Sequence, residues 1–291
     1  LIRKITSAGV VTTLAGTALA VGSTNGTGAA ARFNTPYGVA VDGSGNVYVA
    51  DTNNQLIRKI TPTGVVTTLA GLANISGAND ANGTAATFNL PAGVAVDTAG
   101  NVYVADLSNH LIRKITPTGT VSTLAGNAGI SGANDATGTA ATFNLPTGVA
   151  VDTAGNVYVA DSSNHLIRKI SPAGVVTTLA GTVGVFGSAD GNGTNATFNL
   201  PAGVAVDTAG NVYVADLSNH LIRKITPTGT VSTLAGNAGI SGAINATGTA
   251  ASFDTLHGVA VDTAGNVYVA DSSNFLIRKI SPAGDVSTLA G

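Results

Sequence analysis

Asp254 and His257 are the residues best placed for acid–base chemistry, because they lie three positions apart in one segment of the chain. A carboxylate at that spacing can orient an imidazole, and an oriented imidazole can accept or donate a proton. No nucleophile, glutamate or metal-binding cluster accompanies the pair, and the sequence contains neither Glu nor Cys. We therefore predict no catalytic residue and keep Asp254 and His257 as candidate ligand-binding residues.

Five aspartates at one repeated position would suit a hard cation if they lined the mouth of a channel. They are Asp42, Asp97, Asp152, Asp207 and Asp262. Each of them also opens a turn of the DTAGN type, in which an aspartate hydrogen-bonds the local backbone. The turn alone accounts for these residues, so they do not by themselves predict a metal site.

Two other groups contain side chains of types that bind metals, but their spacing is not that of a metal site. The loop SADGNGTN (188–195) weakly resembles a calcium loop, but it lacks the spaced acidic ligands and the terminal Glu. His110, His165 and His220 occupy equivalent repeat positions, which would spread them apart rather than bring them to one ion. We predict no metal and no cofactor.

These residues belong to a repeat with a period of 55 residues. The string LIRKI occurs six times, beginning at residues 1, 56, 111, 166, 221 and 276, and GVAVD occurs five times, beginning at 38, 93, 148, 203 and 258. A fixed period of this size indicates units that bury their faces against their neighbours. The unequal counts indicate that one unit is incomplete.

Each complete unit contains four predicted strands. In the unit that begins at Gly93 they span 93–97, 101–106, 111–116 and 120–126. Both faces of 101–106 are apolar, which is typical of a sheet packed between two others. A 21-residue link (127–147) leads to the next unit, and each copy of the link contains one Phe. We expect an ordered link whose Phe fills the gap between neighbouring sheets.

Repeated four-stranded antiparallel sheets of this length predict an all-β protein, a β-propeller. The tripeptide Asn-His-Leu occurs at 109–111, 164–166 and 219–221, within the pattern GVAVDTAGNVYVADxSNHLIRKI. The chain resembles the NHL-repeat family over nearly its whole length, and this resemblance implies a propeller that typically has six blades. Gln55 and Phe275 replace the His in two units, so the His is not needed to build a blade.

We predict one domain over residues 1–291, a propeller of the six-bladed type with five complete blades and one partial blade. The complete blades span 38–71, 93–126, 148–181, 203–236 and 258–291, and the partial blade, 1–16, has only its third and fourth strands. A five-bladed ring with a spare hairpin is the alternative. The inner strands of the partial blade would lie upstream of Leu1 or come from another molecule, and its open edge favours self-association.

A unique site must lie among the few residues that depart from the repeat. Arg32 is the only basic residue outside the LIRKI strings, and Tyr37 and His257 share one repeat position, immediately before an inner strand. Both would flank the incomplete blade. We therefore predict Arg32, Tyr37, Asp254 and His257 as candidate ligand-binding residues.

The composition restricts the class of partner. The chain is 44% hydrophobic and 10% charged, and its net charge is −2, which does not favour nucleic acid. No run of about 18 apolar residues predicts a membrane span. The sequence has neither an initial Met nor a signal-type leader, which is typical of a mature or excised domain. Low charge, the absence of Cys and abundant Thr, Asn, Gly and Ala favour a secreted or cell-surface bacterial protein.

Near-identical units suit binding better than catalysis, because a catalytic centre must be asymmetric. Residues 93–133 are identical to residues 203–243. We predict a non-catalytic binding scaffold whose long links contact a protein or a glycan. One alternative is a propeller enzyme, a lyase or a lactonase-like hydrolase with a metal or His centre at the channel, as found among proteins similar to NHL propellers. The other is a structural protein that assembles through the open blade edge.

Overall fold

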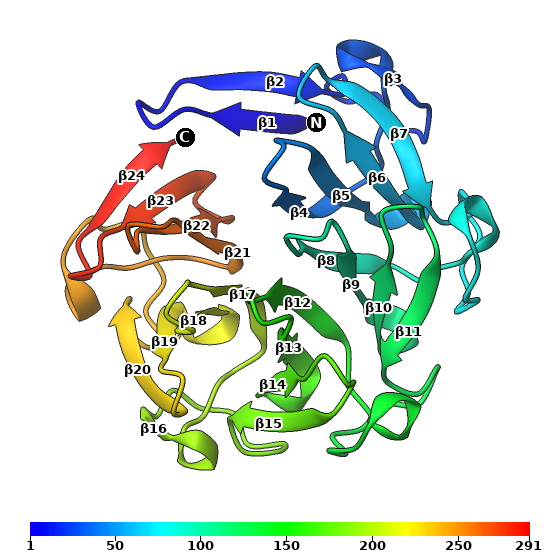
Figure 1. The fold of residues 1–291 in the computed structure, drawn as a ribbon. Helices are drawn as coiled ribbons and strands as arrows, with labels where there is room; N and C mark the ends of the chain where they lie inside the picture. Colours follow the sequence, from blue (N-terminus) through cyan, green and yellow to red (C-terminus); the bar gives the residue numbers. More distant parts are fainter. The chain divides into compact units, whose positions relative to one another are not determined.

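A computed structural model describes residues 1–291, which form β-strands and short 3₁₀ turns and no α-helix. Figure 1 shows five blades, each with four antiparallel strands in sequence order. Their bounds are β4 (Pro36–Val41), β5 (Val47–Asp51), β6 (Leu56–Ile60), β7 (Val65–Ala70); β8 (Pro91–Val96), β9 (Val102–Asp106), β10 (Leu111–Ile115), β11 (Val121–Ala125); β12 (Pro146–Val151), β13 (Val157–Asp161), β14 (Leu166–Ile170), β15 (Val176–Ala180); β17 (Pro201–Val206), β18 (Val212–Asp216), β19 (Leu221–Ile225), β20 (Thr230–Ala235); β21 (Leu256–Val261), β22 (Val267–Asp271), β23 (Leu276–Ile280) and β24 (Val286–Ala290). The predicted all-β propeller fold is thus confirmed.

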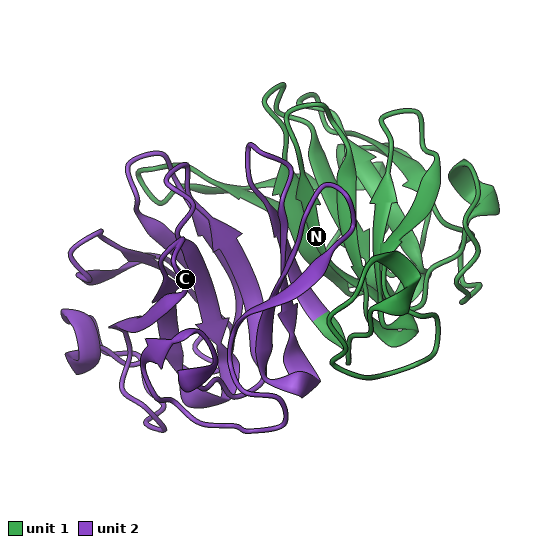
Figure 2. Cartoon of the chain, turned by 60° about the horizontal axis from the view of Figure 1, so that its bottom comes forward, with its two compact units in different colours: residues 1–146 green, residues 147–291 purple.

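The chain divides into two compact units, residues 1–146 and residues 147–291 (Figure 2). The first unit contains an N-terminal hairpin, β1 (Ile2–Ile5) and β2 (Val11–Ala15), followed by blades one and two. The second unit contains blades three to five, apart from Pro146, the first residue of β12.

The number of blades differs from the prediction of a six-bladed propeller with one partial blade: the structure has five blades. Residues 1–16 form a separate two-stranded sheet in which β1 pairs only with β2. Residues 1–16 provide only the two outer strands of the repeat, and two strands do not make the four-stranded sheet of a blade. The hairpin therefore stands as an addition to five blades.

The links are ordered, as the sequence predicts. Short strands in two of them, β3 (Gly26–Thr27) and β16 (Gly191–Asn192), pair with the outer strands β7 and β20. Each link thus runs along the outer strand of the blade to which it leads. Short 3₁₀ turns occur in every link and after the second strand of four blades, and their bounds are η1 (Gly28–Ala30), η2 (Thr52–Asn54), η3 (Gly83–Ala85), η4 (Leu107–Asn109), η5 (Gly138–Ala140), η6 (Ser162–Asn164), η7 (Gly193–Asn195), η8 (Leu217–Asn219) and η9 (Gly248–Ala250).

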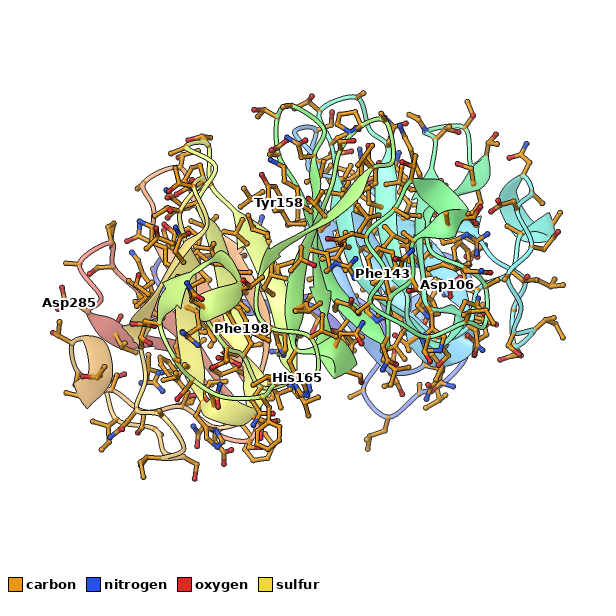
Figure 3. The ribbon with its side chains drawn as sticks, turned by 90° about the horizontal axis from the view of Figure 1, so that it is seen from below. Asp106, Phe143, Tyr158, His165, Phe198 and Asp285 are labelled. Atoms are coloured by element: carbon orange, nitrogen blue, oxygen red, sulfur yellow. The ribbon has the colours of Figure 1, made fainter.

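Within each unit the core lies between consecutive blades, and a phenylalanine from the link fills it. In the first unit, fully buried Phe88 packs with Tyr48 and Ala50 of blade one and with Val102 and Val104 of blade two. Figure 3 labels Phe198 and Tyr158, which belong to the corresponding cluster in the second unit. Burial of a large apolar side chain contributes about 1.5–3 kcal/mol, so the Phe stabilises both the link and the packing of the blades.

Inner strands of consecutive blades approach so closely that only glycine fits. A Cβ added to Gly38 would lie 2.3 Å from the carbonyl oxygen of Ala92, and one added to Gly203 would lie 2.3 Å from that of His257. Both distances are far below van der Waals contact. The Gly of GVAVD therefore sets the spacing between blades.

Candidate functional site

A fully buried arginine ties each link to its blade. In blade two, Nη1 of Arg113 donates to Asp106 Oδ2 at 2.8 Å and to the Thr87 carbonyl at 3.1 Å. Its Nη2 donates to Asp80 Oδ1 at 2.6 Å and to the Asn79 carbonyl at 3.1 Å. Thr87, Asn79 and Asp80 all belong to the link, so one guanidinium anchors the link at two places.

We use the name Arg clamp for a buried Arg that bonds both the link and the Asp at the end of the second strand. The Arg clamp recurs with small changes along the chain. The guanidinium also lies over the ring of the link Phe, at 5.2 Å from the centroid for Arg113 and Phe88, which suits a cation–π contact. Asn25 and Asn245 replace the link aspartate and accept from Arg58 and Arg278 through their Oδ1 atoms. The pairing of Arg with the Asp at the end of the second strand is present in every blade.

The aspartate of the clamp is a buried carboxylate with several donors. Burial raises the pKa of Asp106 to about 6, although the backbone N–H of Asn89, the charge of Arg113 and the amide of Asn109 favour the ionised form. Asp106 is labelled in Figure 3. Because this carboxylate is sealed from solvent and used by the link, its role is structural.

The Asn-His-Leu segment holds two links at once. Nδ2 of Asn109 donates to Asp106 at 2.8 Å and to the Gly77 carbonyl of the preceding link at 2.7 Å. His110 has a left-handed backbone (φ 59°), and its Nδ1 accepts from the backbone N–H of Leu145, in the following link, at 3.1 Å. Partial burial lowers the pKa of His110, which favours the neutral imidazole that can accept this bond.

The sequence analysis did not predict this role of the histidine, because it assigned the side chain no hydrogen-bond partner. Gln55 performs the same function, since its Oε1 accepts from the N–H of Leu90 at 2.7 Å. His165 likewise accepts from Leu200, at 3.1 Å. The substitution of Gln for His was the signal, because both side chains can accept a hydrogen bond.

Each of four links begins with a tight turn that exposes an aliphatic side chain. In the first of these turns the N–H of Asn74 donates to the Asn54 carbonyl at 3.0 Å, and the N–H of Ile75 donates to the Leu72 carbonyl at 3.1 Å. Equivalent bonds hold the other three turns. The side chains that these turns present are exposed by 47–55%: Ile75, Ile130, Val185 and Ile240.

At the end of two links, a leucine lies beside the Asn-His-Leu segment and presents a second apolar side chain. Leu145 and Leu200, which donate to His110 and His165, are themselves exposed. In each unit we call the surface of these exposed side chains its link face: Ile75, Ile130 and Leu145 in the first unit, and Val185, Leu200 and Ile240 in the second. Hydrogen bonds to an Asn-x-Leu segment of the same unit fix the turns and the link ends.

The link of residues 182–202 exposes more large apolar side chains than any other link. Val183 and Phe186 are exposed, in addition to Val185. The ring of Phe186 lies 6.0 Å from that of His165, in a tilted arrangement. An exposed aromatic side chain supported by a second ring is the kind of anchor on which protein interfaces depend.

The four predicted ligand-binding residues lie in different surroundings. Arg32 donates to the Ala29 and Ala31 carbonyls of its own link, at 2.6 and 2.8 Å. Tyr37 lines a cavity beside the N-terminal hairpin, together with Arg3 and Val39. The structure thus places Tyr37 next to the hairpin, as the sequence predicts, whereas Arg32 serves its own backbone.

Asp254 and His257 lie close in sequence, but their nearest partners differ. Oδ1 of Asp254 accepts from the Thr255 hydroxyl at 3.0 Å and lies 3.8 Å from Nδ1 of His220. Nδ1 of His257 lies 3.3 Å from the Thr255 carbonyl. This ring nitrogen thus lies beside a backbone carbonyl.

The repeated aspartates close turns, as the sequence predicts. Asp97 accepts from the backbone and the side chain of Asn101, each at 2.8 Å, and from the hydroxyl of Tyr103 at 3.2 Å. No group of three or more His or Asp side chains able to hold a metal ion is present within either unit. No helix of the structure is long and apolar enough to cross a membrane.

Comparison with known sequences finds both the repeat and longer relatives. Five NHL repeats match residues 33–60, 88–115, 143–170, 198–225 and 253–280. NHL repeat-containing protein 2 of Bos taurus is 32% identical over 282 residues, covering 84% of this chain and 39% of the relative. Protein SUPPRESSOR OF QUENCHING 1, chloroplastic, of Arabidopsis thaliana is 32% identical over 268 residues, covering 86% of this chain and 25% of the relative. These relatives are eukaryotic and do not show the predicted bacterial origin.

Solved structures similar to the chain share its fold. A structure of a nidogen/laminin complex matches with a TM-score of 0.63 at 16% identity, covering 89% of this chain and 81% of that one. A gluconolactonase of Xanthomonas campestris matches with a TM-score of 0.61 at 14% identity, covering 88% and 75%. Virginiamycin B lyase of Staphylococcus aureus matches with a TM-score of 0.55 at 13% identity, covering 87% and 69%. These structures include both binding proteins and enzymes. The repeats, the relatives and the bladed fold together identify the chain as a member of the NHL-repeat family.

Proposed function

We propose that the protein is a non-catalytic binding scaffold whose link face contacts a protein or a glycan. The observation that carries this proposal is the exposed aliphatic side chain at one position of four links, at Ile75, Ile130, Val185 and Ile240. A side chain that is half exposed contributes little to the stability of the core. Its recurrence on turns held by backbone hydrogen bonds is therefore better explained by contact with a partner.

Preorganisation supports a binding role for this face. The buried Arg clamps fix the links to their blades, so a partner would meet surfaces that are already ordered. Binding to an ordered surface avoids the loss of conformational entropy that a mobile loop would incur. The aliphatic character of these side chains, and the exposed ring of Phe186, favour a protein over a glycan.

The enzyme alternative has the support of a shared fold only. Lyase and gluconolactonase structures resemble this chain at 13–14% identity, and many unrelated functions use one fold. Asp254 accepts from the Thr255 hydroxyl, and Nδ1 of His257 lies near the Thr255 carbonyl; neither contact by itself supports an acid–base role. A scaffold is the function that the geometry supports best.

A fourfold variant tests the proposal: Ile75→Ser, Ile130→Ser, Val185→Ser and Ile240→Ser. We expect an unchanged unfolding transition, because exposed substitutions alter stability by about 0.5 kcal/mol or less. Immobilised wild type and variant would be exposed to a protein extract and, separately, to a glycan array. The wild type should retain a partner that the variant does not.

A matched control removes apolar side chains of similar exposure elsewhere. Val65 and Val175 are exposed beside the turns that precede the outer strands, outside the links. Val65→Ser with Val175→Ser should leave partner retention intact. Equal retention by the link variant and the wild type, or equal loss in the link variant and this control, would contradict binding through the link face.

We further propose that the scaffold acts outside the cell or at its surface. The low charge and the absence of cysteine support this location. Fractionation of the source cells with an antibody against the chain tests it, and recovery only in the cytosol would contradict it.

A further inference from the structure

One residue near the end of every link has a left-handed backbone, with φ between 49° and 53°. Only glycine adopts this conformation at no steric cost, because a Cβ crowds the neighbouring carbonyl oxygen. Local hydrogen bonds must therefore hold the other residue types in place. The five residues are Thr35, Leu90, Leu145, Leu200 and Thr255.

The two threonines among them are held through their own hydroxyl groups. Nδ2 of Asn53 donates to the Thr35 hydroxyl at 2.9 Å. The hydroxyl of Ser273 donates to that of Thr255 at 2.8 Å. Leucine has no hydroxyl group, so the same position needs a different support where it is a leucine.

The three leucines depend on an acceptor from an Asn-x-Leu segment. The side chain that accepts from each leucine N–H is Gln55 for Leu90 at 2.7 Å, His110 for Leu145 at 3.1 Å and His165 for Leu200 at 3.1 Å. The amide oxygen of Gln accepts at any pH. The Nδ1 atom of His accepts only while the ring is neutral, because the imidazolium carries a proton on both nitrogens. Two of the three bonds thus depend on protonation.

No neighbouring carboxylate compensates a proton on either ring. Burial is the only cause that lowers the pKa of His110 and of His165, and no charged side chain contributes. The charged side chains of the neighbouring strands and link are paired with one another: Asp106 with Arg113, Asp161 with Arg168, and Asp190 with Arg223. As the pH falls below about 6.5, protonation of either ring therefore removes a hydrogen bond and creates no ion pair.

His220 differs from the other two histidines of this segment. Its Nδ1 is buried without a hydrogen-bond partner and lies 3.8 Å from Oδ1 of Asp254. Thr255, at the position of the leucines, is held through its hydroxyl. Protonation of His220 thus breaks no hydrogen bond to a link, which makes this residue a control within the chain.

The two histidines that hold leucines lie beside exposed apolar side chains of the link face. Leu145 and Leu200 are 37% and 39% exposed. The ring of Phe186, which is 69% exposed, lies 6.0 Å from that of His165, labelled in Figure 3. A partner that covers these side chains also covers the ring beside them, and burial of an unpaired imidazolium is unfavourable.

We propose that His110 and His165 make binding through the link face dependent on pH. While both rings are neutral, they hold Leu145 and Leu200 in the left-handed conformation that the link face presents. Once protonated, they release the two leucines and place a positive charge beside an apolar surface, so that a bound partner dissociates. The binding part of this inference rests on the proposed function, whereas the release of the leucines is a property of the chain alone.

The amide resonances of the leucines test this release on the free chain. In protein labelled with ¹⁵N-leucine, the amide protons of Leu145 and Leu200 should move upfield, as a lost hydrogen bond requires, when the pH is lowered from about 7.5 to about 5. The amide proton of Leu90 should not move. His165→Gln should abolish the shift of Leu200 and preserve that of Leu145, since Gln55 accepts the equivalent bond. His220→Gln should preserve both shifts.

The effect on binding is measured with the immobilised chain after exposure to a protein extract at about pH 7.5. A wash at about pH 5 should elute the retained partner from the wild type. It should not elute the partner from the double variant His110→Gln with His165→Gln. This comparison separates titration of the two histidines from titration of the partner.

Two results would overturn the proposal. One is a pair of amide protons, at Leu145 and Leu200, that do not move with pH. The other is elution that is the same for the wild type and the double Gln variant. A wild type that retains no partner at either pH would refute the proposed function and with it the binding part, while the leucine resonances would still decide whether the histidines release the links.

Discussion

Replacing Arg113 by methionine tests the idea that one buried guanidinium holds a link on its blade. The side chain is fully buried and makes four hydrogen bonds, to Asp106, Thr87, Asp80 and Asn79. Methionine keeps much of the volume but leaves the Asp106 carboxylate buried beside an apolar chain. Loss of one partner of a buried ion pair costs about 3–5 kcal/mol, so we expect a decrease of that size in the free energy of unfolding.

The chain offers a matched control at the same repeat position. Arg3 lies in the exposed part of β1, so Arg3→Met should change the free energy of unfolding by about 0.5 kcal/mol or less. The double variant Arg113→Met with Asp106→Leu should recover part of the loss, because it removes the unpaired carboxylate. Urea unfolding measures the free energy of unfolding of all three variants. Amide hydrogen exchange of residues 77–88 reports on the order of the link itself.

The pH dependence separates a lost ion pair from lost packing. Burial already raises the pKa of Asp106 to about 6 with Arg113 present, and removal of the positive charge raises it further. The folded variant then binds more protons than the unfolded chain, so its stability should increase as the pH falls from about 7 to about 5. Loss of packing alone would give a deficit that does not depend on pH. The reasoning is refuted if Arg113→Met costs no more than Arg3→Met, or if its deficit is constant over this range.

Three further outcomes follow from the same contacts. Burial lowers the pKa of His110, so its contribution to stability should be lost as the pH falls below the unfolded value of about 6.5. The unfolding temperature of His110→Gln should lack this pH dependence, and a plot of unfolding temperature against pH identical to that of the wild type would contradict it. Phe198→Ala should cost about 3–5 kcal/mol, whereas Phe186→Ala, at an exposed site, should leave the urea midpoint nearly unchanged. Gly203→Ala places a Cβ 2.3 Å from a carbonyl oxygen and should lower stability by about 1–3 kcal/mol, while Gly258→Ala, whose nearest contact is at 3.7 Å, should not; equal melting temperatures would exclude the close approach as the cause.

The strands and the core could be predicted because local pattern determines them. In β9 every residue is buried, which the apolar residues on both faces of 101–106 indicate. The Phe of each link is predictable in the same way, since a single large apolar residue in a polar link needs a core to enter. The turn aspartates follow from the preference of Asp for hydrogen bonds with nearby backbone.

The hydrogen bonds of the links could not be predicted, because they join residues far apart in sequence. His110 accepts from a backbone N–H 35 residues away, and a backbone donor carries no sequence signal. Arg113 donates to Asp80 across 33 residues. Thr255, between Asp254 and His257, has a left-handed backbone (φ 53°), which the sequence does not indicate because a residue other than glycine rarely adopts it.

The six copies of LIRKI show why an identical sequence does not ensure an identical environment. In a blade, the Arg of this string is buried because the preceding strand brings an aspartate and the link brings carbonyl oxygens. In β1 the strand pairs only with β2, and Arg3 and Lys4 are exposed. Burial of a charged residue thus depends on the partners that the rest of the unit supplies.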